Sequence, residues 1–142
     1  MYPLQGNPRQ PYAKINLELQ DLAYQTGVSE EHFLSYDTED DRLAGFLRLS
    51  LPHENNLLEL QDLEGAAIIR EVHVYGQSLE VGTEQAGAAQ HAGLGKNLIQ
   101  KAEEIARGQG YKRLAVIAAV GTRQYYAMRG FEMGELYMVK PL

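Results

Sequence analysis

The chain contains no cysteine and no tryptophan among its 142 residues. Without a thiol it cannot form a disulfide, a cysteine nucleophile, a thiolate zinc site or an iron–sulfur cluster. It also lacks an apolar run of the roughly 18 residues that a membrane-spanning helix requires, so we expect no membrane association. The first residues, MYPLQ, show neither the basic nor the apolar segment of a secretory signal. These absences are compatible with a cytoplasmic protein.

A surplus of positive charge is also absent, because the formal net charge is −6. This charge argues against binding of nucleic acid by the whole surface regardless of sequence. The charge is uneven along the chain, however. Residues 1–89 hold 5 Lys/Arg and 15 Asp/Glu, which gives −10, whereas residues 90–142 hold 8 and 4, which gives +4. An anionic ligand would favour the basic second part of the chain, and the alternative is that the asymmetry is ordinary scatter of surface charge.

The length and composition fit one globular unit. Hydrophobic residues make up 44% of the chain and charged residues 23%, which suffices for a single domain with its own core. We predict one domain over residues 1–142. Pro3, Pro8 and Pro11 and the lack of apolar periodicity predict an irregular arm over residues 1–12.

The first half of the chain is predicted to be an antiparallel meander. Apolar and polar residues alternate over Lys14–Tyr24, which is the period-two pattern of a half-buried strand. Further strands are predicted over Glu31–Asp37 and Arg42–Leu51, and turn-forming residues at 26–29 and 38–41 separate the three. We expect the acidic turn at 38–41 to be a solvated hairpin tip and not a metal site.

The second half is predicted to contain a strand, a helix and a parallel strand. Residues 52–65 form a connection with one helical turn near Leu57–Leu63. A strand follows over Ala66–Tyr75, then a helix over about Gly95–Gln109, and then a seven-residue apolar run over Leu114–Val120 that suits a strand buried on both faces. The residues that we expect on the buried face of the helix are Leu98, Ile99, Ala102, Ile105 and Ala106.

The end of the chain is predicted to add a short helix and more strands. The short helix runs from the N-cap residue Thr122 to Arg129 and ends at Gly130. One or two strands follow over Phe131–Val139. The expected total is six or seven strands, with two helices in the second half.

A glycine-containing stretch, Gln90–Lys96 (QHAGLGK), stands before the predicted long helix, after a flexible loop over Gly82–Ala89. Gly93 and Gly95 lack a Cβ, so they permit unusual φ angles and let the backbone approach a ligand closely. A helix that begins here presents free N–H groups and its positive end, which suits a phosphate or pyrophosphate. Taken alone, the stretch is equally compatible with an ordinary turn. The order of strand, Q-x-x-G-x-G and helix is similar to the coenzyme A pyrophosphate loop of GNAT N-acetyltransferases.

Several separated motifs support a more specific resemblance. They occur in the order Phe33–Tyr36, Leu47–Leu49, Val72–Gly76, Gln90–Gly95, Gly121–Tyr126 and Tyr137–Lys140. Together they resemble the lysine-acetyltransferase-type domain of the catalytic subunit of Elongator, which modifies the wobble uridine of tRNA. The resemblance covers roughly residues 31–142. It implies an α/β (α+β) fold of the GNAT acyl-CoA N-acyltransferase type, with a mixed central sheet, splayed strands and flanking helices.

The chain also departs from that family. The family carries a radical S-adenosylmethionine domain with an iron–sulfur cluster and a cysteine zinc site, and this chain has no cysteine for either. We therefore expect a stand-alone acetyltransferase-like module, an excised piece, or half of a split system. A separate radical SAM subunit and tRNA are candidate partners. The first strand is expected to replace the helical N-terminal part of an ordinary GNAT fold.

The resemblance implies acetyl-coenzyme A (acetyl-CoA) as cosubstrate, with no metal in this chain. Backbone groups around Gly93–Lys96 would hold its pyrophosphate, and its pantetheine arm would lie along the strand edge at Glu71–Val74. Splaying of this strand from the one over Leu114–Val120 would open the slot. The implied cofactor-binding residues are Glu71, Val72, His73, Val74, Gln90, His91, Gly93, Leu94, Gly95, Lys96, Asn97 and Tyr126.

Four residues are candidates for catalysis. Tyr125 and Tyr126 begin the helix after the buried strand, and a phenol there can donate a proton to the leaving sulfur. We prefer Tyr126, and the alternative is that one ring packs in the core while the other touches the coenzyme. Glu71 and His73 share one face of their strand, and either can act as the base. Their alternative roles are a buried ion pair and a hydrogen-bonded histidine.

Other charged residues have weaker assignments. Lys96 and Arg123 lie near the proposed phosphate region, and Lys112 and Arg113 are candidates for contact with RNA. His91 is a candidate contact for the coenzyme or the acceptor, or a residue that caps the loop. The remaining histidines, His32 and His53, are expected on the surface. The four histidines of the chain, which include His73, do not have the spacing of a zinc site.

Three hypotheses for function follow from these residues. The first is an acetyl-CoA-dependent enzyme related to the Elongator subunit, which acts on tRNA or is stimulated by it and can hydrolyse acetyl-CoA. The second is a GNAT transferase that acetylates an amine on a protein lysine or a small molecule. The third is a module that binds acetyl-CoA or a partner without turnover.

Overall fold

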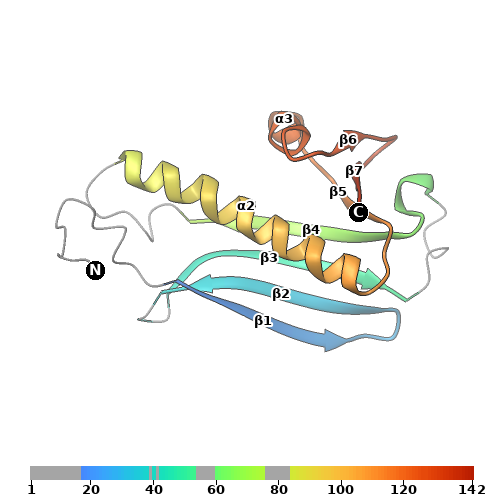
Figure 1. The fold of residues 1–142 in the computed structure, drawn as a ribbon, viewed down its shortest axis with the longest axis horizontal. Helices are drawn as coiled ribbons and strands as arrows, with labels where there is room; N and C mark the ends of the chain where they lie inside the picture. Colours follow the sequence, from blue (N-terminus) through green and yellow to red (C-terminus); the bar gives the residue numbers. More distant parts are fainter. Residues whose placement is uncertain (1–16, 39, 41, 54–59, 76–83) are drawn as a thin grey trace.

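The computed structural model describes residues 17–38, 40, 42–53, 60–75 and 84–142, and of residues 84–92 the backbone. It contains one seven-stranded sheet with the strand order β1-β2-β3-β4-β5-β7-β6 (Figure 1). The strands are β1 (Glu18–Gln25), β2 (Ser29–Asp37), β3 (Leu43–Pro52), β4 (Ala66–Val74), β5 (Arg113–Val116), β6 (Glu132–Met133) and β7 (Met138–Pro141). The helices are η3 (Gln61–Leu63), α2 (Glu84–Gly108), η4 (Val120–Thr122) and α3 (Arg123–Ala127). The predicted irregular arm at 1–12 lies outside the described residues.

The antiparallel meander is confirmed, but the expectation that its first strand is half-buried is wrong, because all eight residues of β1 are exposed. β1 pairs with β2, β2 with β3, and β3 with β4, each in antiparallel orientation. β4 then pairs with β5 in parallel, and α2 connects the two strands. The expected strand–helix–strand unit and the mixed sheet are therefore present, and α2 lies across one face of the sheet (Figure 1).

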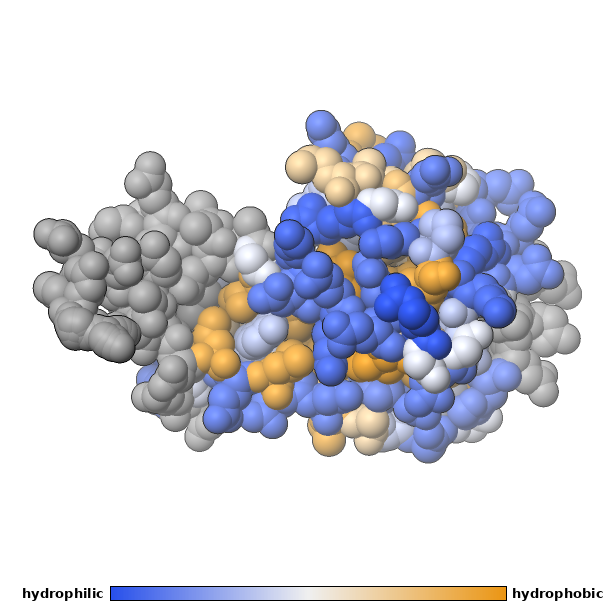
Figure 2. Space-filling model, viewed as in Figure 1, coloured by the Kyte–Doolittle hydropathy of each residue, from blue (hydrophilic) through white to orange (hydrophobic). Residues whose placement is uncertain are grey.

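Two cores cover the two faces of the sheet. On the face under α2, buried side chains from β2, β3 and β4 pack against Leu98, Ile99, Ala102 and Ala106 of the helix. These are the helix residues predicted to be buried, and Ile105 is partly buried beside them. On the opposite face, a smaller cluster forms from Leu63, Ala66, Ile68 and Ala115. The surface on the side of α2 is mainly hydrophilic (Figure 2), as expected for the outer face of an amphipathic helix.

The predicted start of the long helix is wrong. We expected a loop over Gly82–Ala89 and a helix from Gly95, but α2 begins at Glu84 and contains the whole glycine stretch. Gly82 itself lies outside the described residues. The segment from Glu84 onward, EQAGAAQHA, is rich in alanine and glutamine, which favour helix enough to offset the roughly 1 kcal/mol that a glycine costs.

The predicted end of the next strand is also wrong. We expected a strand over Leu114–Val120, but β5 ends at Val116. Ile117 is 62% exposed and Val120 is 76% exposed, so this apolar run does not continue into a buried strand. Thr122 occupies the N-cap position of α3 as predicted, but its hydroxyl donates to the carbonyl of Ala119 instead of capping the helix.

A buried carboxylate connects the C-terminal strands to the rest of the sheet. Asp62 in η3 accepts hydrogen bonds from the backbone N–H groups of Glu135, Leu136 and Tyr137, at 2.8–3.1 Å. These hydrogen bonds hold the pKa of the Asp62 carboxyl below its ordinary value. A Cβ on Gly134 would overlap this carboxylate, so the turn between β6 and β7 requires a glycine there.

Candidate functional site

The parallel pairing of β4 with β5 stops halfway along β4. The paired residues run from Ala66 opposite Arg113 to Ile69 opposite Val116. At the same point the β3–β4 ladder contains a bulge, because Arg48 lies opposite Glu71 while Leu49 lies opposite Ile69. Beyond the bulge, β4 continues to Val74 with no strand on its β5 side among the described residues. The predicted splaying of the two strands is therefore confirmed.

The residues of the splayed half of β4 divide between the two faces of the sheet. Val72 packs against the core under α2, and Val74 packs near Leu94 of the helix. Glu71 and His73 lie on the opposite face, as their shared spacing predicted. The backbone edge between these two rows faces the gap left by β5.

Glu71 and His73 each have a neighbour from β3. The Glu71 carboxylate lies 3.3 Å from a guanidinium nitrogen of Arg48, and both side chains are roughly half exposed. The His73 ring lies beside Phe46, with ring centroids 5.8 Å apart, and beside Tyr75, with centroids 4.9 Å apart, and the rings of Phe46 and Tyr75 are themselves 6.3 Å apart. The alternative of an ion pair thus applies to Glu71, although the pair is exposed and not buried.

The two neighbouring tyrosines of α3 have different surroundings. The Tyr126 side chain is 8% exposed and packs edge-on against Phe131, with ring centroids 5.5 Å apart. Burial raises the pKa of the Tyr126 phenol, so this group stays protonated. The hydroxyl of Tyr125 instead lies against α2, where a Cβ on Gly95 would overlap it. One ring is in the core and the other reaches the glycine stretch.

Arg129 holds Tyr125 from the other side. Its guanidinium carbon lies 3.6 Å from the centroid of the Tyr125 ring, and its Nη1 donates to the Tyr125 carbonyl at 2.8 Å. Arg129 Nε is buried and has no hydrogen-bond partner within the described part of the chain. Sequence reasoning missed this residue, although the spacing of four residues from Tyr125 on a helix is a signal that could have found it.

The glycine stretch lies inside α2 and not at its start. Gly93 is exposed and Gly95 is buried, and neither is among the described glycines with positive φ. The freedom in φ that glycine permits is therefore not used at these two positions, because both residues lie within a helix. Leu94 is buried, whereas Lys96 and Asn97 are exposed. The side chains of Gln90 and His91 lie outside the described ones.

The three remaining cationic candidates differ in their surroundings. Arg113 donates through Nε and Nη2 to the backbone carbonyls of Gln61 and Glu64, at 2.6–3.0 Å, and so holds η3 in place. The Arg113 guanidinium, a candidate for contact with RNA, is therefore engaged with the backbone of its own chain. Lys112 and Arg123 are exposed.

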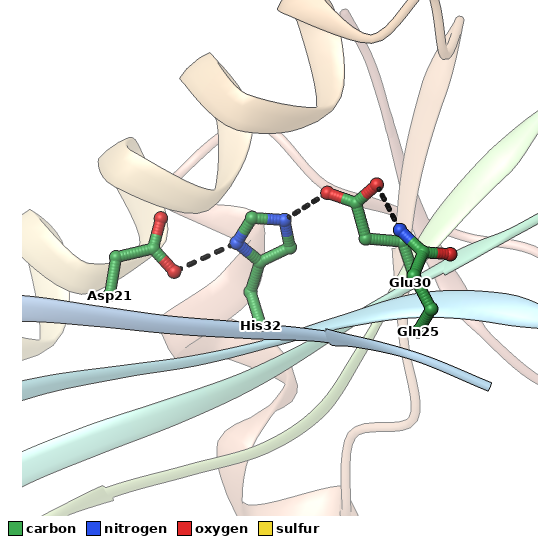
Figure 3. A network of polar contacts seen from close by, with 4 residues as sticks. All are labelled: Asp21, Gln25, Glu30 and His32. Carbon is green, nitrogen blue, oxygen red and sulfur yellow. Dashed lines mark hydrogen bonds and ion pairs between the residues drawn. The ribbon is translucent and has the colours of Figure 1, made fainter.

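His32 is buried, although we expected it on the surface. It is 7% exposed, and its Nδ1 lies 2.8 Å from Asp21 while its Nε2 lies 2.7 Å from Glu30. Figure 3 shows the ring between the two carboxylates, which come from β1 and from β2 itself. Burial alone would lower the pKa of His32, but the hydrogen bonds to Asp21 and Glu30 outweigh it and raise the pKa above its ordinary value. His53 is exposed as predicted.

The described residues show neither a metal-binding cluster nor a membrane-spanning helix. No cluster of three or more histidine, aspartate or glutamate side chains there is arranged to hold a metal ion. None of the described helices combines the length and the apolar character needed to cross a membrane.

Comparison with known proteins assigns this geometry to a family. The acetyltransferase (GNAT) family matches residues 4–131. The chain is 40% identical over 127 residues to the tRNA uridine(34) acetyltransferase of Dehalococcoides mccartyi, which covers 87% of this chain and 28% of that protein. It is 45% identical over 115 residues to Elongator complex protein 3 of Danio rerio, which covers 79% of this chain and 21% of that protein.

A solved structure agrees with these relatives. The Elp3 of the archaeon Methanocaldococcus infernus superimposes with a TM-score of 0.71 and 28% identity, over 96% of this chain and 31% of that one. The chain therefore spans less than a third of the length of these relatives. The splayed mixed sheet, the ordered motifs and the family match lead to one conclusion: the chain belongs to the acetyltransferase (GNAT) family and is homologous to the acetyltransferase domain of Elongator complex protein 3.

Proposed function

We propose that this chain cleaves the thioester of acetyl-CoA in a reaction that acts on tRNA or is stimulated by it. The observation that carries the proposal is the free edge of β4 beyond Ile69, beside the Tyr125 hydroxyl and Gly95. When bound, acetyl-CoA supplies an activated acetyl group. The tasks of the protein are to hold this substrate, to orient it, and to move protons to and from the reacting groups.

The pantetheine arm fits the unpaired edge of β4. An extended chain with amide groups can add to a strand edge through backbone hydrogen bonds, and Glu71–Val74 offer such an edge where β5 has diverged. Val72 and Val74 line the side under α2 with apolar surface, and Glu71 and His73 line the other side with groups that can accept a proton. We assign the coenzyme to the first side and the acceptor to the second.

The pyrophosphate assignment requires a change in α2. The amides of Gly93–Lys96 lie in the helix interior, where each N–H is directed to the carbonyl four residues earlier. These amides become available to a phosphate only if the turns before Gly93, from Glu84, unwind. We therefore propose that coenzyme binding shortens α2 and leaves Gly93–Lys96, with Gln90, His91 and Asn97 beside them, at its new start.

The two tyrosines divide two tasks in this proposal. Tyr126 donates its proton to the sulfur as the thioester bond breaks. Burial raises the pKa of its phenol, so the proton is present for donation, although the same shift makes the phenol a weaker acid. Tyr125 contacts the coenzyme next to Gly95. Glu71 or His73 accepts the proton of the attacking group, directly or through a water molecule.

The link to tRNA rests on the names of the relatives and not on a surface of this chain. One relative is named for acetylation at uridine 34 of tRNA, and the others are named as part of the Elongator complex. The resemblance to the catalytic subunit of Elongator implies radical SAM chemistry at the uridine, and we propose a separate radical SAM subunit as the partner that supplies it. We place this activity in the cytoplasm.

Two measurements test the proposal. Isothermal titration with acetyl-CoA measures binding, and hydrogen exchange of the Gly93–Lys96 amides measures whether α2 opens when the coenzyme is added. We expect the exchange rates of these amides to change when acetyl-CoA is added. They should rise if the amides lose their helical hydrogen bonds, or differ from those of the free helix if the amides bind the phosphate instead. Unchanged exchange together with tight binding would refute the assignment of the pyrophosphate to this stretch.

The reaction is tested by release of the coenzyme thiol, with and without tRNA. Release that tRNA increases supports the proposed function. Release that needs an amine substrate and ignores tRNA indicates an ordinary GNAT transferase of proteins or small molecules. Tight binding without release under any condition indicates a binding module.

A further inference from the structure

The outer strand β1 is an edge with no neighbour among the described residues. It stands at one end of the seven-stranded sheet, and all eight of its residues are exposed. Its register with β2 runs from Glu18 opposite Asp37 to Gln25 opposite Glu30 without a bulge. α2 contacts β2, β3 and β4 and so covers the sheet beside β1 but leaves the edge itself open (Figure 1).

This edge lacks the features that usually prevent pairing with another chain. Such edges are normally protected by lysine, proline, a bulge or an inward-pointing charge. The sequence of β1, ELQDLAYQ, contains no lysine, arginine or proline. Its one carboxylate toward the α2 side, Asp21, is held by His32 at 2.8 Å. Asp21 is therefore engaged within its own chain through His32.

The face away from α2 adds an apolar surface to the edge. Leu22 lies opposite Phe33, which places it on the face of Phe33 and not on the face of α2. Leu22 is 64% exposed, and Tyr24, two residues on and on the same face, is 50% exposed. Phe33 stacks on Phe46 of β3 with ring centroids 5.1 Å apart. The apolar row thus runs from the interior of the sheet to its open edge and stops there.

We propose that the open edge of β1 is the interface between two copies of this chain, which pair through their β1 strands as an antiparallel, two-fold symmetric extension of the sheet. In antiparallel pairs, residues directly opposite each other lie on the same face of the sheet. The possible registers are therefore those that bring the Leu22 face of one copy onto the same side as the Leu22 face of the other. One such register places Leu22 opposite Leu22 of the second copy, Asp21 opposite Ala23, and Gln20 opposite Tyr24. It pairs the two strands over Leu19–Gln25.

Two neighbouring registers also keep the faces matched. One places Asp21 opposite Asp21 of the second copy, and like charges directly opposite destabilise a strand pair. The other places Ala23 opposite Ala23 and so moves the two Leu22 side chains apart. The register centred on Leu22 instead continues the apolar row across the interface. A symmetric contact of this kind closes as a dimer and leaves no further edge of the same type.

The absence of cysteine makes this proposal directly testable by cross-linking. In Leu22→Cys the two introduced thiols lie opposite each other, within the separation of about 4.4–6.8 Å between Cα atoms that a disulfide spans. Mild oxidation is expected to yield a covalent dimer in high yield. In the control Leu19→Cys the two thiols lie about 20 Å apart along the paired strands, so no dimer is expected.

Sedimentation of the unmodified chain over a wide range of concentrations measures the association itself. The chain is expected to form dimers, and Leu22→Lys, which opposes two ammonium groups at the centre, is expected to weaken them about tenfold or more. Val28→Lys, at a residue 55% exposed but outside β1, is the matched control and is expected to leave the dimer intact. A monomer at every concentration, a dimer that Leu22→Lys does not weaken, or equal cross-linking at residues 19 and 22 would each overturn the proposal.

Discussion

The meander of β1 to β3 and the unit of β4, α2 and β5 differ in how completely their central strands are paired. β2 is paired along its whole length, with β1 on one side and β3 on the other. β4 is paired with β5 only as far as Ile69, where a bulge on its other side changes its direction. Glu71 and His73 lie on the face of the sheet opposite α2, whereas the Tyr125 hydroxyl lies on the side of α2, beside Gly95. The candidate residues therefore border the stretch of β4 that has no β5 partner among the described residues.

The largest expected effect is on turnover at the incompletely paired region. Tyr126→Phe should lower the rate of thiol release about 10²-fold, because general acid catalysis by a positioned side chain contributes at least that much. Binding of acetyl-CoA, measured by titration, should change much less. Tyr111→Phe is the control, since its hydroxyl donates to the Pro52 carbonyl away from β4, and its turnover should be normal. Equal turnover in Tyr126→Phe and the unmodified chain would remove the acid role.

The second effect concerns the stability of the contact between η3 and the turn before β7, where all three hydrogen bonds to Asp62 are formed. Asp62→Ala removes the acceptor of three backbone hydrogen bonds and should lower the free energy of unfolding by about 3 kcal/mol, measured by urea denaturation. Asp40→Ala, at an exposed carboxylate in the hairpin turn, should have little effect.

The pH dependence of this effect has a defined sign. Because the folded pKa of Asp62 is depressed, its contribution is present above the unfolded pKa of about 3.9 and is lost as the pH falls through the folded value. Asp62→Ala should therefore match the unmodified chain in stability only at strongly acidic pH. A constant difference between the two at all pH values would contradict this assignment.

The third effect separates the two glycines of the Gln90–Lys96 stretch. Gly95→Ala should weaken coenzyme binding about tenfold, because the new Cβ displaces the Tyr125 hydroxyl. Gly93→Ala meets nothing within 4 Å, so it should leave Tyr125 in place and add roughly 0.5–1 kcal/mol of stability as an alanine within a helix. However, Gly93→Ala should also hinder opening of α2 if coenzyme binding requires it. Equal affinities for the two variants would argue against a contact between Tyr125 and the coenzyme.

The sequence predicted the meander well for a physical reason. Turn-forming residues separate its strands, and β2 and β3 carry apolar residues such as Leu34, Leu47 and Leu49 that indicate burial. The alternation over β1 indicated a strand but not its burial, because all eight residues of β1 are exposed. The start of α2 was not predictable in the same way, since alanine, glutamine and glycine around residue 90 carry no periodic signal. The early end of β5 was hidden because Ile117 and Val120 are apolar yet exposed.

The site was predictable where it depends on local spacing and not where it depends on contacts between elements. Glu71 and His73 share a face because of strand geometry, which the sequence contains. The burial of His32 between two carboxylates and the stacking of Arg129 on Tyr125 depend on how elements meet. Of these, only the spacing of Tyr125 and Arg129 left a trace in the sequence.

The smallest expected effect is in the meander, where the buried His32 should make the stability of the β1–β2 pair depend on pH. Both of its ring nitrogens face carboxylates, so the cationic ring satisfies both whereas the neutral ring can donate to only one. A folded pKa above the unfolded value of about 6.5 means that this stability is fully present below that pH and is lost as the pH rises through the folded pKa. His32→Gln should therefore lower the free energy of unfolding by about 1 kcal/mol at pH values below 6.5 and less at alkaline pH. His53→Gln, at an exposed histidine, is the control and should keep the pH dependence of the unmodified chain. If His32→Gln keeps that dependence too, the two carboxylates do not hold β1 through a charged ring.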